Sequence, residues 1–250
     1  MAKRMTVPKI RGPRSKKHHQ MEFTAIPQTR KPVQITPLNE TQRVYIQTIH
    51  RNDITFGIGR AGTGKTFLAA QVALKFMTEG LVRKIVICRP AIEAGGEKIG
   101  FLPGAINDKM DPYIRPIIDV FSKYWSMRTV KDYMAEGLIE IVPLAYMRGR
   151  TFEDIFIIAD EMQNATSDQL LMLLTRLGKG RKMVITGDPI QSDVNGYSCF
   201  NTAHGILRNV QDIGFVRFHN RDVVRHPTVE RILNVWPVSQ IRVQHGAMAA

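Results

Sequence analysis

The sequence has little of what builds disulfide-linked, metal-stabilised or membrane-spanning proteins. Its two cysteines, Cys88 and Cys199, lie far apart and outside any CxxC motif, so we expect buried reduced thiols. The seven histidines show neither an HExxH motif nor a paired Cys/His spacing, which argues against structural zinc. No apolar run approaches the ~18 residues of a membrane span, and the N-terminus lacks the apolar stretch of a secretory signal. We therefore expect a cytoplasmic protein that makes no use of a membrane.

Positive charge is the strongest bias of the composition, and it is concentrated at the N-terminus. The formal net charge is +13. Residues 1–34 contain a single acid, Glu22, and nine basic residues, which are Lys3, Arg4, Lys9, Arg11, Arg14, Lys16, Lys17, Arg30 and Lys31. A basic arm favours a polyanionic partner, usually nucleic acid, and its prolines and weak periodicity indicate an extended, disordered segment. The alternative is a solvated tail that only aids solubility.

After this arm, apolar strand-like segments alternate with helix-like segments. Strands are expected at residues 54–58, 84–88, 138–142, 154–159, 182–186 and 215–218. Helices are expected at 39–51, 65–78, 111–136 (in two pieces split near Ser126), 167–177, 197–210 and 228–235. The glycines and prolines of residues 89–110 indicate a long loop. The alternation predicts an α/β fold, a parallel sheet covered by helices on both faces, with an arm at 1–35 and one domain at 36–250.

A phosphate-binding loop follows the first predicted strand. Its G-x-x-x-x-G-K-T pattern consists of Gly59, Arg60, Ala61, Gly62, Thr63, Gly64, Lys65 and Thr66. Glycines let the backbone amides turn inward around phosphates, and the N-terminus of the next helix favours the same anion. We expect Lys65 to reach the β- and γ-phosphates and Thr66 to bind Mg²⁺. A strand before the loop and a helix after it disfavour a chance glycine-rich turn.

Two later strands end in polar residues that suit the hydrolytic half of phosphate chemistry. Asp160 and Glu161 follow the strand at 155–159, where an aspartate can hold Mg²⁺ and a glutamate can act as general base for water. Taken alone, this pair could instead be an acidic helix N-terminus. Gln191, in the Gly-Asp-Pro-Ile-Gln segment after the strand at 183–186, is expected to sense the γ-phosphate, although that segment alone could be a simple turn. The acidic pair and Gln191 together argue against a kinase.

Gln42 lies 17 residues before the loop and can offer a donor and an acceptor to an adenine edge. The alternative is a capping segment in which Asn39 or Thr36 starts the first helix. The two roles are compatible.

The content and order of these motifs resemble the PhoH family, the phosphate-starvation-inducible ATPases of bacteria and phages. The resemblance covers about residues 36–233, and its matching segments are 36–42, 59–66, 89–94, 97–104, 111–116, 143–151, 160–166, 187–191 and 222–227. It implies a RecA-like P-loop NTPase core, ATP and Mg²⁺ as ligands, and RNA or single-stranded nucleic acid as partner, in the host cytoplasm if a phage encodes the chain. Arg60 departs from the family, which usually has a small residue or proline there. The Gly95-Gly96 pair is one residue longer than the common spacing.

A single core with one phosphate loop also predicts self-assembly. The likeness to RecA-like rings implies a homo-oligomer, a hexamer, in which Arg225, or else Arg221, approaches the nucleotide of the next subunit. The alternative for Arg225 is a structural ion pair.

Nucleic acid is expected to run over the loops at the strand ends. The candidate contacts are Arg89, Lys98, Phe101, Tyr146, Arg148 and Arg150. The alternative is an ordinary polar surface with core aromatics. Two functions stay open: an ATPase stimulated by nucleic acid, such as a helicase or RNA remodeller, and a nucleotide-gated binding module with slow turnover.

Overall fold

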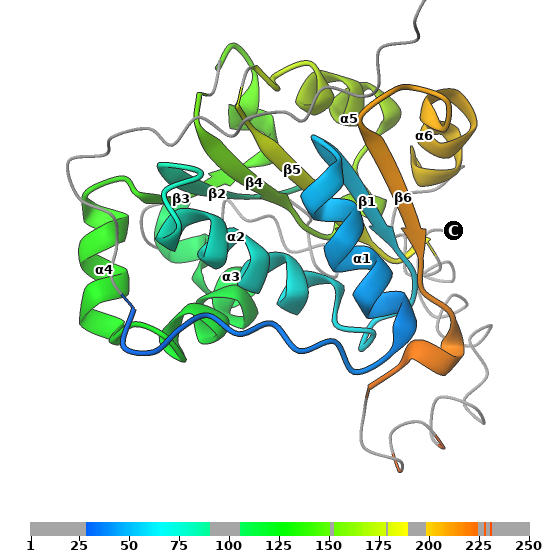
Figure 1. Cartoon of the computed structure of the whole chain (residues 1–250). Helices are drawn as coiled ribbons and strands as arrows, with labels where there is room; N and C mark the ends of the chain where they lie inside the picture. Colours follow the sequence, from blue (N-terminus) through cyan, green and yellow to red (C-terminus); the bar gives the residue numbers. More distant parts are fainter. Residues whose placement is uncertain are drawn as a thin grey trace, which may run out of the picture.

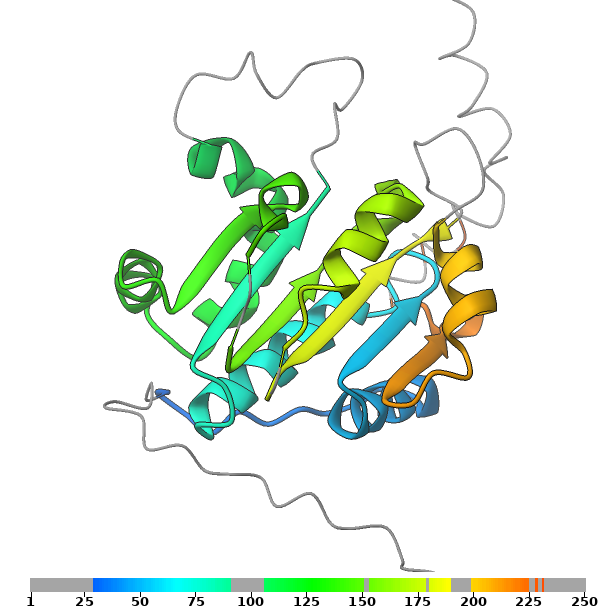
Figure 2. The same cartoon turned by 90° about the horizontal axis from the view of Figure 1, so that it is seen from above.

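The protein is described by a computed structural model at residues 29–90, 106–150, 153–178, 180–189 and 199–224, together with Thr228 and Arg231. In these residues one six-stranded sheet has the order β3-β2-β4-β5-β1-β6, and every neighbouring pair is parallel. The strands are β1 (Ile54–Ile58), β2 (Lys84–Arg89), β3 (Ile139–Pro143), β4 (Ile155–Ala159), β5 (Lys182–Gly187) and β6 (Ile213–Arg217). All of the arrowheads therefore point to one edge of the sheet (Figure 2).

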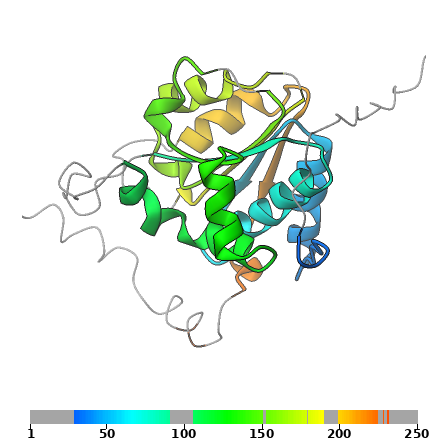
Figure 3. The same cartoon turned by 90° about the vertical axis from the view of Figure 1, so that its left-hand side faces the viewer.

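Helices cover both faces of this sheet (Figures 1 and 3). One face packs against α1 (Glu40–Arg51), α2 (Lys65–Thr78), α3 (Ile106–Ser122) and α4 (Met127–Ala135), and the other against α5 (Ser167–Leu174) and α6 (Cys199–Leu207). Strand β2 shows why the strands are continuous apolar runs in the amino-acid sequence. Ile85 and Ile87 enter the core on the α1–α4 side, whereas Val86 and Cys88 enter the core on the α5–α6 side. The predicted α/β class is confirmed.

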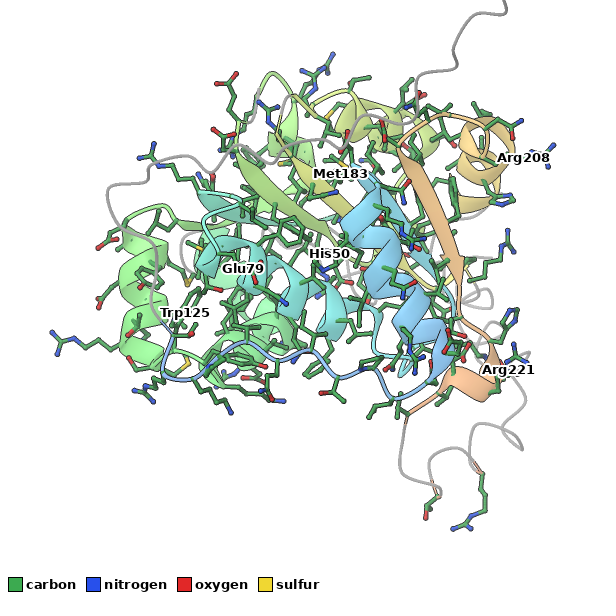
Figure 4. The ribbon with its side chains drawn as sticks, in the orientation of Figure 1. His50, Glu79, Trp125, Met183, Arg208 and Arg221 are labelled. Carbon is green, nitrogen blue, oxygen red and sulfur yellow. The ribbon has the colours of Figure 1, made fainter. Side chains whose placement is uncertain are left out.

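Capping side chains explain where several helices begin. Asn39 caps α1 by accepting a hydrogen bond from the backbone N–H of Gln42 at 2.9 Å. Ser126 caps α4 in the same way through the Thr129 N–H, which confirms the predicted division near this residue. Trp125, labelled in Figure 4 and 1% exposed, fills the junction of α3 and α4.

Several predicted boundaries are wrong. Helix α3 begins at Ile106, inside the segment predicted as a loop, although Pro112 and Pro116 lie within the helix. The buried side chains of its second half, such as Ile117 and Phe121, pack into the core and outweigh the local effect of the prolines. Helix α5 ends three residues early, and β6 begins two residues early. The predicted helix at 228–235 lies outside the described residues except for Thr228 and Arg231.

The last residues of the predicted arm are extended and pack against the domain. The Arg30 N–H donates to the Tyr124 carbonyl at 3.0 Å, and the Tyr124 hydroxyl donates to the Gln34 carbonyl at 3.3 Å. Val33 and Ile35 pack against the core on the α1–α4 side. Residues 1–28 lie outside the described part of the chain.

The two cysteines are free and buried, as expected from the sequence. Burial raises the pKa of Cys88 to about 12 and that of Cys199 to about 11, so both thiols are protonated at neutral pH. In the part of the chain that the structure describes, no helix has both the length and the apolar character that a membrane crossing requires.

Candidate active site

The candidate site lies at the carboxyl edge of the sheet, where β1, β4 and β5 end side by side. The glycine loop follows β1, the acidic pair follows β4, and the Gly187-Asp188-Pro189 turn follows β5. Since neighbouring parallel strands end at the same edge, motifs about ninety residues apart in sequence meet at one place.

The glycine loop has a backbone that side chains would not allow. Gly62 and Gly64 have φ angles of +86° and +83°. At Gly59, with φ +150°, a Cβ would lie 2.5 Å from the Phe218 carbonyl oxygen. Gly64 is the N-cap of α2 and has no side chain to cap the helix, so the first N–H groups of α2 are available to an anion.

Lys65 is held against this loop by its own ammonium group. Its Nζ donates to the carbonyls of Gly59 and Arg60 at 2.5 and 2.7 Å, and to the Thr63 hydroxyl at 3.3 Å. The residue is only 7% exposed. Oxygen acceptors therefore surround the ammonium, and phosphate oxygens are acceptors of the same kind.

Asp160 joins the acidic segment to the loop. The Thr66 hydroxyl donates to Asp160 Oδ1 at 2.7 Å, and the Thr186 hydroxyl at the end of β5 donates to the same oxygen at 2.5 Å. Asp160 is 5% exposed. A hydroxyl and a carboxylate oxygen in contact are the hard ligands that Mg²⁺ prefers. These two residues therefore fit a magnesium ion.

Glu161 has an unusual backbone and two side-chain partners. Its φ and ψ are 56° and 34°, the left-handed region that a residue with a Cβ rarely adopts. Arg89 Nη2 lies 3.1 Å from Glu161 Oε1, and Gln163 Nε2 donates to Glu161 Oε2 at 2.6 Å. The same Arg89 nitrogen lies 3.5 Å from Asp160 Oδ2. One guanidinium thus contacts both carboxylates and offsets part of their charge.

Two further residues connect the acidic segment to the glycine loop. Gln163 Oε1 accepts from the Asp188 N–H at 3.0 Å, and Asp188 Oδ2 accepts from the Ala61 N–H of the loop at 3.1 Å. Gln163 is 2% exposed and Asp188 is 4% exposed. A chain of hydrogen bonds therefore runs from Glu161 through these two residues to the phosphate loop. Sequence reasoning missed both residues, although both lie in the segments that it quoted.

Gln42 is 2% exposed and uses both ends of its amide within the protein. Its Oε1 accepts from the Leu38 N–H at 2.7 Å, and its Nε2 donates to the Thr63 carbonyl of the loop at 3.1 Å. In this structure Gln42 therefore links the segment before α1 to the glycine loop.

Gly57, two residues before the loop, allows a close approach of Tyr45 from α1. A Cβ at Gly57 would lie 2.7 Å from the Tyr45 ring and hydroxyl. Burial, and secondly the charge of Asp160, raise the pKa of Tyr45 well above 10, so the phenol is neutral. The ring makes an edge contact with Phe218, with centroids 5.2 Å apart.

The predicted nucleic-acid residues divide into several groups. Tyr146 is 60% exposed in the short helix η3 (Leu144–Met147), and Arg148 is exposed directly after it. Arg150 forms a bidentate pair with Glu140 of β3 at 2.7 and 2.8 Å, and Lys84 of β2 also contacts Glu140. The Arg150 hydrogen bonds, with a smaller contribution from Lys84, lower the pKa of Glu140 against the opposing effect of burial.

Lys98, Phe101, Gln191 and Arg225 lie outside the described residues, so their predicted roles stay predictions. Arg221 is exposed in the short helix η6 (Asn220–Asp222), beyond the end of β6 (Figure 4). The chain next to it contacts the glycine loop, because the Val224 N–H donates to the Gly62 carbonyl at 2.8 Å.

The family described as "PhoH-like protein" matches this sequence over residues 34–237. The chain belongs to that family. It is 43% identical over 229 residues to a PhoH-like protein of Synechocystis, which covers 91% of this chain and 70% of that protein. It is 46% identical over 197 residues to a PhoH-like protein of Bacillus subtilis, covering 78% and 61%. Protein PhoH of Escherichia coli is 37% identical over 202 residues, covering 79% and 57%. The chain thus spans only part of the length of each relative.

Among solved structures, the large terminase of a thermophilic bacteriophage, determined in complex with ADP, has a similar fold. The TM-score is 0.51 at 11% identity, over 80% of this chain and 50% of that chain. This likeness concerns the fold alone. With the parallel sheet and the loop after β1, it confirms the predicted RecA-like P-loop NTPase core, and family and fold together support a nucleotide-binding protein of the ATPase type.

Proposed function

We propose that this protein hydrolyses ATP with Mg²⁺ and couples the hydrolysis to binding or remodelling RNA or another single-stranded nucleic acid. The observation that supports the hydrolytic part best is the 2.7 Å hydrogen bond between Thr66 and Asp160, which lie 94 residues apart in sequence. It brings together the two oxygen groups expected to hold the metal, beside the loop that binds phosphate and next to Glu161.

Each residue has a distinct part in this mechanism. The backbone amides of the loop and of the first turn of α2 bind the phosphate oxygens, and Lys65 exchanges its loop carbonyls for the β- and γ-phosphates. Thr66 and Asp160 would hold Mg²⁺, which when bound would neutralise charge on the phosphates. Glu161 accepts a proton from the attacking water. Asp188 and Gln163 fix the loop and Glu161 relative to each other.

Charge and exposure support the nucleic-acid part of the proposal. The basic residues at 1–34 provide contacts that need no particular sequence. Tyr146 and Arg148 offer an exposed ring and an exposed guanidinium after β3, at the same edge as the candidate site.

A specific observation also favours the second function, a nucleotide-gated binding module with slow turnover. Both carboxylate oxygens of Glu161 already have partners, which are Arg89 and Gln163. An enzyme whose base is held in this way would hydrolyse ATP slowly until Glu161 was released.

Steady-state ATPase turnover separates the two functions. Wild type and Glu161→Gln are compared without nucleic acid and with single-stranded RNA, single-stranded DNA and duplex. A coupled ATPase is stimulated by at least one single strand, and Glu161→Gln stays inactive throughout. A rate that is slow and equal under all conditions supports the binding module. Equal rates in wild type and Glu161→Gln contradict the assignment of the base.

We also propose a homo-oligomeric ring, a hexamer, in which Arg225 or Arg221 acts on the nucleotide of the next subunit. Arg225→Ala and Glu161→Gln are each expected to be nearly inactive. Mixed rings should regain activity, because some interfaces pair an intact Glu161 with an intact Arg225. If mass measurement confirms mixed rings that stay inactive, Arg225 does not act between subunits. A wild type that stays monomeric with ATP and nucleic acid and hydrolyses at full rate contradicts the ring.

A further inference from the structure

The contacts of Glu161 place its carboxylate between two strands. Arg89, the last residue of β2, contacts Oε1, while Gln163, whose amide oxygen accepts from Asp188 after β5, contacts Oε2. In the sheet, β2 borders β4 on one side, and β5 and β1 lie on the other. The phosphate loop follows β1, so Arg89 reaches Oε1 from a strand on the side of β4 away from the phosphate loop.

This arrangement is unfavourable for a base that must accept a proton from water beside the γ-phosphate. A general base needs a lone pair directed at that water, and a lone pair of Oε1 is directed at a charged guanidinium instead. The backbone of Glu161 is also in the left-handed region, at φ 56°. Such strain in a non-glycine residue persists only when surrounding contacts maintain it. The two side-chain contacts of Glu161 therefore stabilise a resting geometry.

Arg89 is placed where a second anion can compete for it. Its side chain is 14% exposed, so its guanidinium is nearly enclosed but can be approached. In register, Arg89 pairs with Pro143 of β3, directly before the short helix that carries the exposed Tyr146. Arg89, at the end of β2, thus lies between the catalytic carboxylates after β4 and the exposed residues after β3 that we propose for nucleic acid. A phosphodiester matches the guanidinium as well as a carboxylate does, since both accept two parallel N–H bonds.

We propose that Arg89 is a latch on Glu161, and that the phosphate backbone of single-stranded nucleic acid releases it. In the resting state Arg89 binds Glu161 and Asp160, and turnover is slow. When a backbone phosphate takes the guanidinium, Oε1 of Glu161 is free to accept a proton from water, while Gln163 still holds Oε2. Arg89 is in this sense a positioning residue, because it acts through Glu161. The inference rests on the proposed ATP hydrolysis and names its regulation.

The test compares the ATPase kinetics of Arg89→Ala and wild type without nucleic acid and with saturating polyuridylate RNA. Removal of the latch is expected to raise the basal kcat on the order of tenfold, the effect of losing one hydrogen bond to a charged group. The KM for ATP is expected to stay within about twofold of the wild-type value. The ratio of kcat with RNA to kcat without RNA is expected to fall toward one. The matched control is Arg83→Ala, which removes an exposed arginine directly before β2, at the opposite edge of the sheet. It should leave both the basal rate and the stimulation unchanged.

Other outcomes overturn the latch. A lower or unchanged basal kcat in Arg89→Ala contradicts it, since a residue that only binds nucleic acid or only stabilises the fold has no means to raise basal turnover. Arg89→Lys keeps the charge on a shorter side chain that lacks the guanidinium fork, so its hold on Glu161 should be weaker and its basal rate intermediate. If circular dichroism shows that Arg89→Ala does not fold, Arg89→Lys alone tests the proposal. A basal rate of Arg89→Lys at or below that of wild type then overturns it.

The failure of the latch and the failure of the proposed function give different results. If wild type is stimulated by RNA but neither Arg89 variant shows a raised basal rate, the latch fails and the ATPase stands. If wild type hydrolyses ATP with no response to RNA, release by nucleic acid is overturned. If wild type and Arg89→Ala both stay at the background of Glu161→Gln, the proposed hydrolysis fails and the latch fails with it.

Discussion

Lys65→Ala should affect both the stability of the empty protein and its response to nucleotide. The ammonium of Lys65 donates to two carbonyls and a hydroxyl of the glycine loop and is 7% exposed. Hydrogen bonds from a charged donor contribute about 1.5–3 kcal/mol. Water replaces part of this in a loop at the protein surface, so we expect a net loss of about 2 kcal/mol. For a domain of this size the Tm should fall by roughly 4–8 °C.

The second effect is measured with a non-hydrolysable ATP analogue and Mg²⁺. In wild type, ligand at about 100 times its Kd adds about 2.7 kcal/mol to the free energy of unfolding, which raises the Tm by roughly 5–11 °C. Lys65→Ala should show almost none of this rise, because the charge that neutralises the phosphates is gone. Thermal unfolding followed by circular dichroism, with and without the analogue, measures both effects.

Lys75→Ala is the matched control. Lys75 lies on the same helix, and its side chain is 37% exposed in an ion pair with Glu79 at 3.7 Å. An exposed pair of this kind contributes about 0.5 kcal/mol or less, so this variant should melt and bind as wild type does. A Lys65→Ala protein with an unchanged Tm and an undiminished analogue-induced rise would refute the role given to Lys65.

Three further predictions concern other parts of the molecule. Glu140→Gln should cost about 1 kcal/mol of stability at pH 7. Because Arg150 lowers the pKa of Glu140, this difference should begin to shrink near the ordinary glutamate pKa of about 4.3 and disappear as the pH falls through the lowered pKa; a difference that does not shrink with falling pH contradicts the ion pair. Gly57→Ala should cost about 1–3 kcal/mol through its clash with Tyr45, and an unchanged Tm would refute that packing. Deletion of residues 1–20 removes seven Lys/Arg and should lower the log–log salt slope of RNA binding by up to about 5; an unchanged slope makes the arm an inert tail.

The sequence predicts β1 and α2 to the residue, because the glycine loop determines where the strand ends and where the helix begins. It places the division between α3 and α4 correctly, since Ser126 is a capping residue. It fails at the start of α3, because the glycines and prolines that indicated a loop at 89–110 all precede Ile106, where the helix begins.

The residues of the candidate site were likewise predictable only in part from the sequence. The glycine loop and Asp160 were predictable because each has its own local pattern, and the structure brings them together through Thr66. The pairing of Arg89 with Glu161 was not predictable, since it depends on β2 lying next to β4 in the sheet. Gln163 was missed for a similar reason, because its partners come from two different loops.

The most direct test of hydrolysis at this site is a single-turnover measurement of ATP cleavage by wild type and by Glu161→Gln, with Mg²⁺, single-stranded RNA and enzyme in excess. Both proteins should bind ATP with similar Kd, because glutamine keeps the shape of the side chain. Cleavage of the bound ATP should be slower in Glu161→Gln by about 10²-fold or more. Cleavage of bound ATP at the wild-type rate in Glu161→Gln, or no binding of ATP by wild type, would contradict the account.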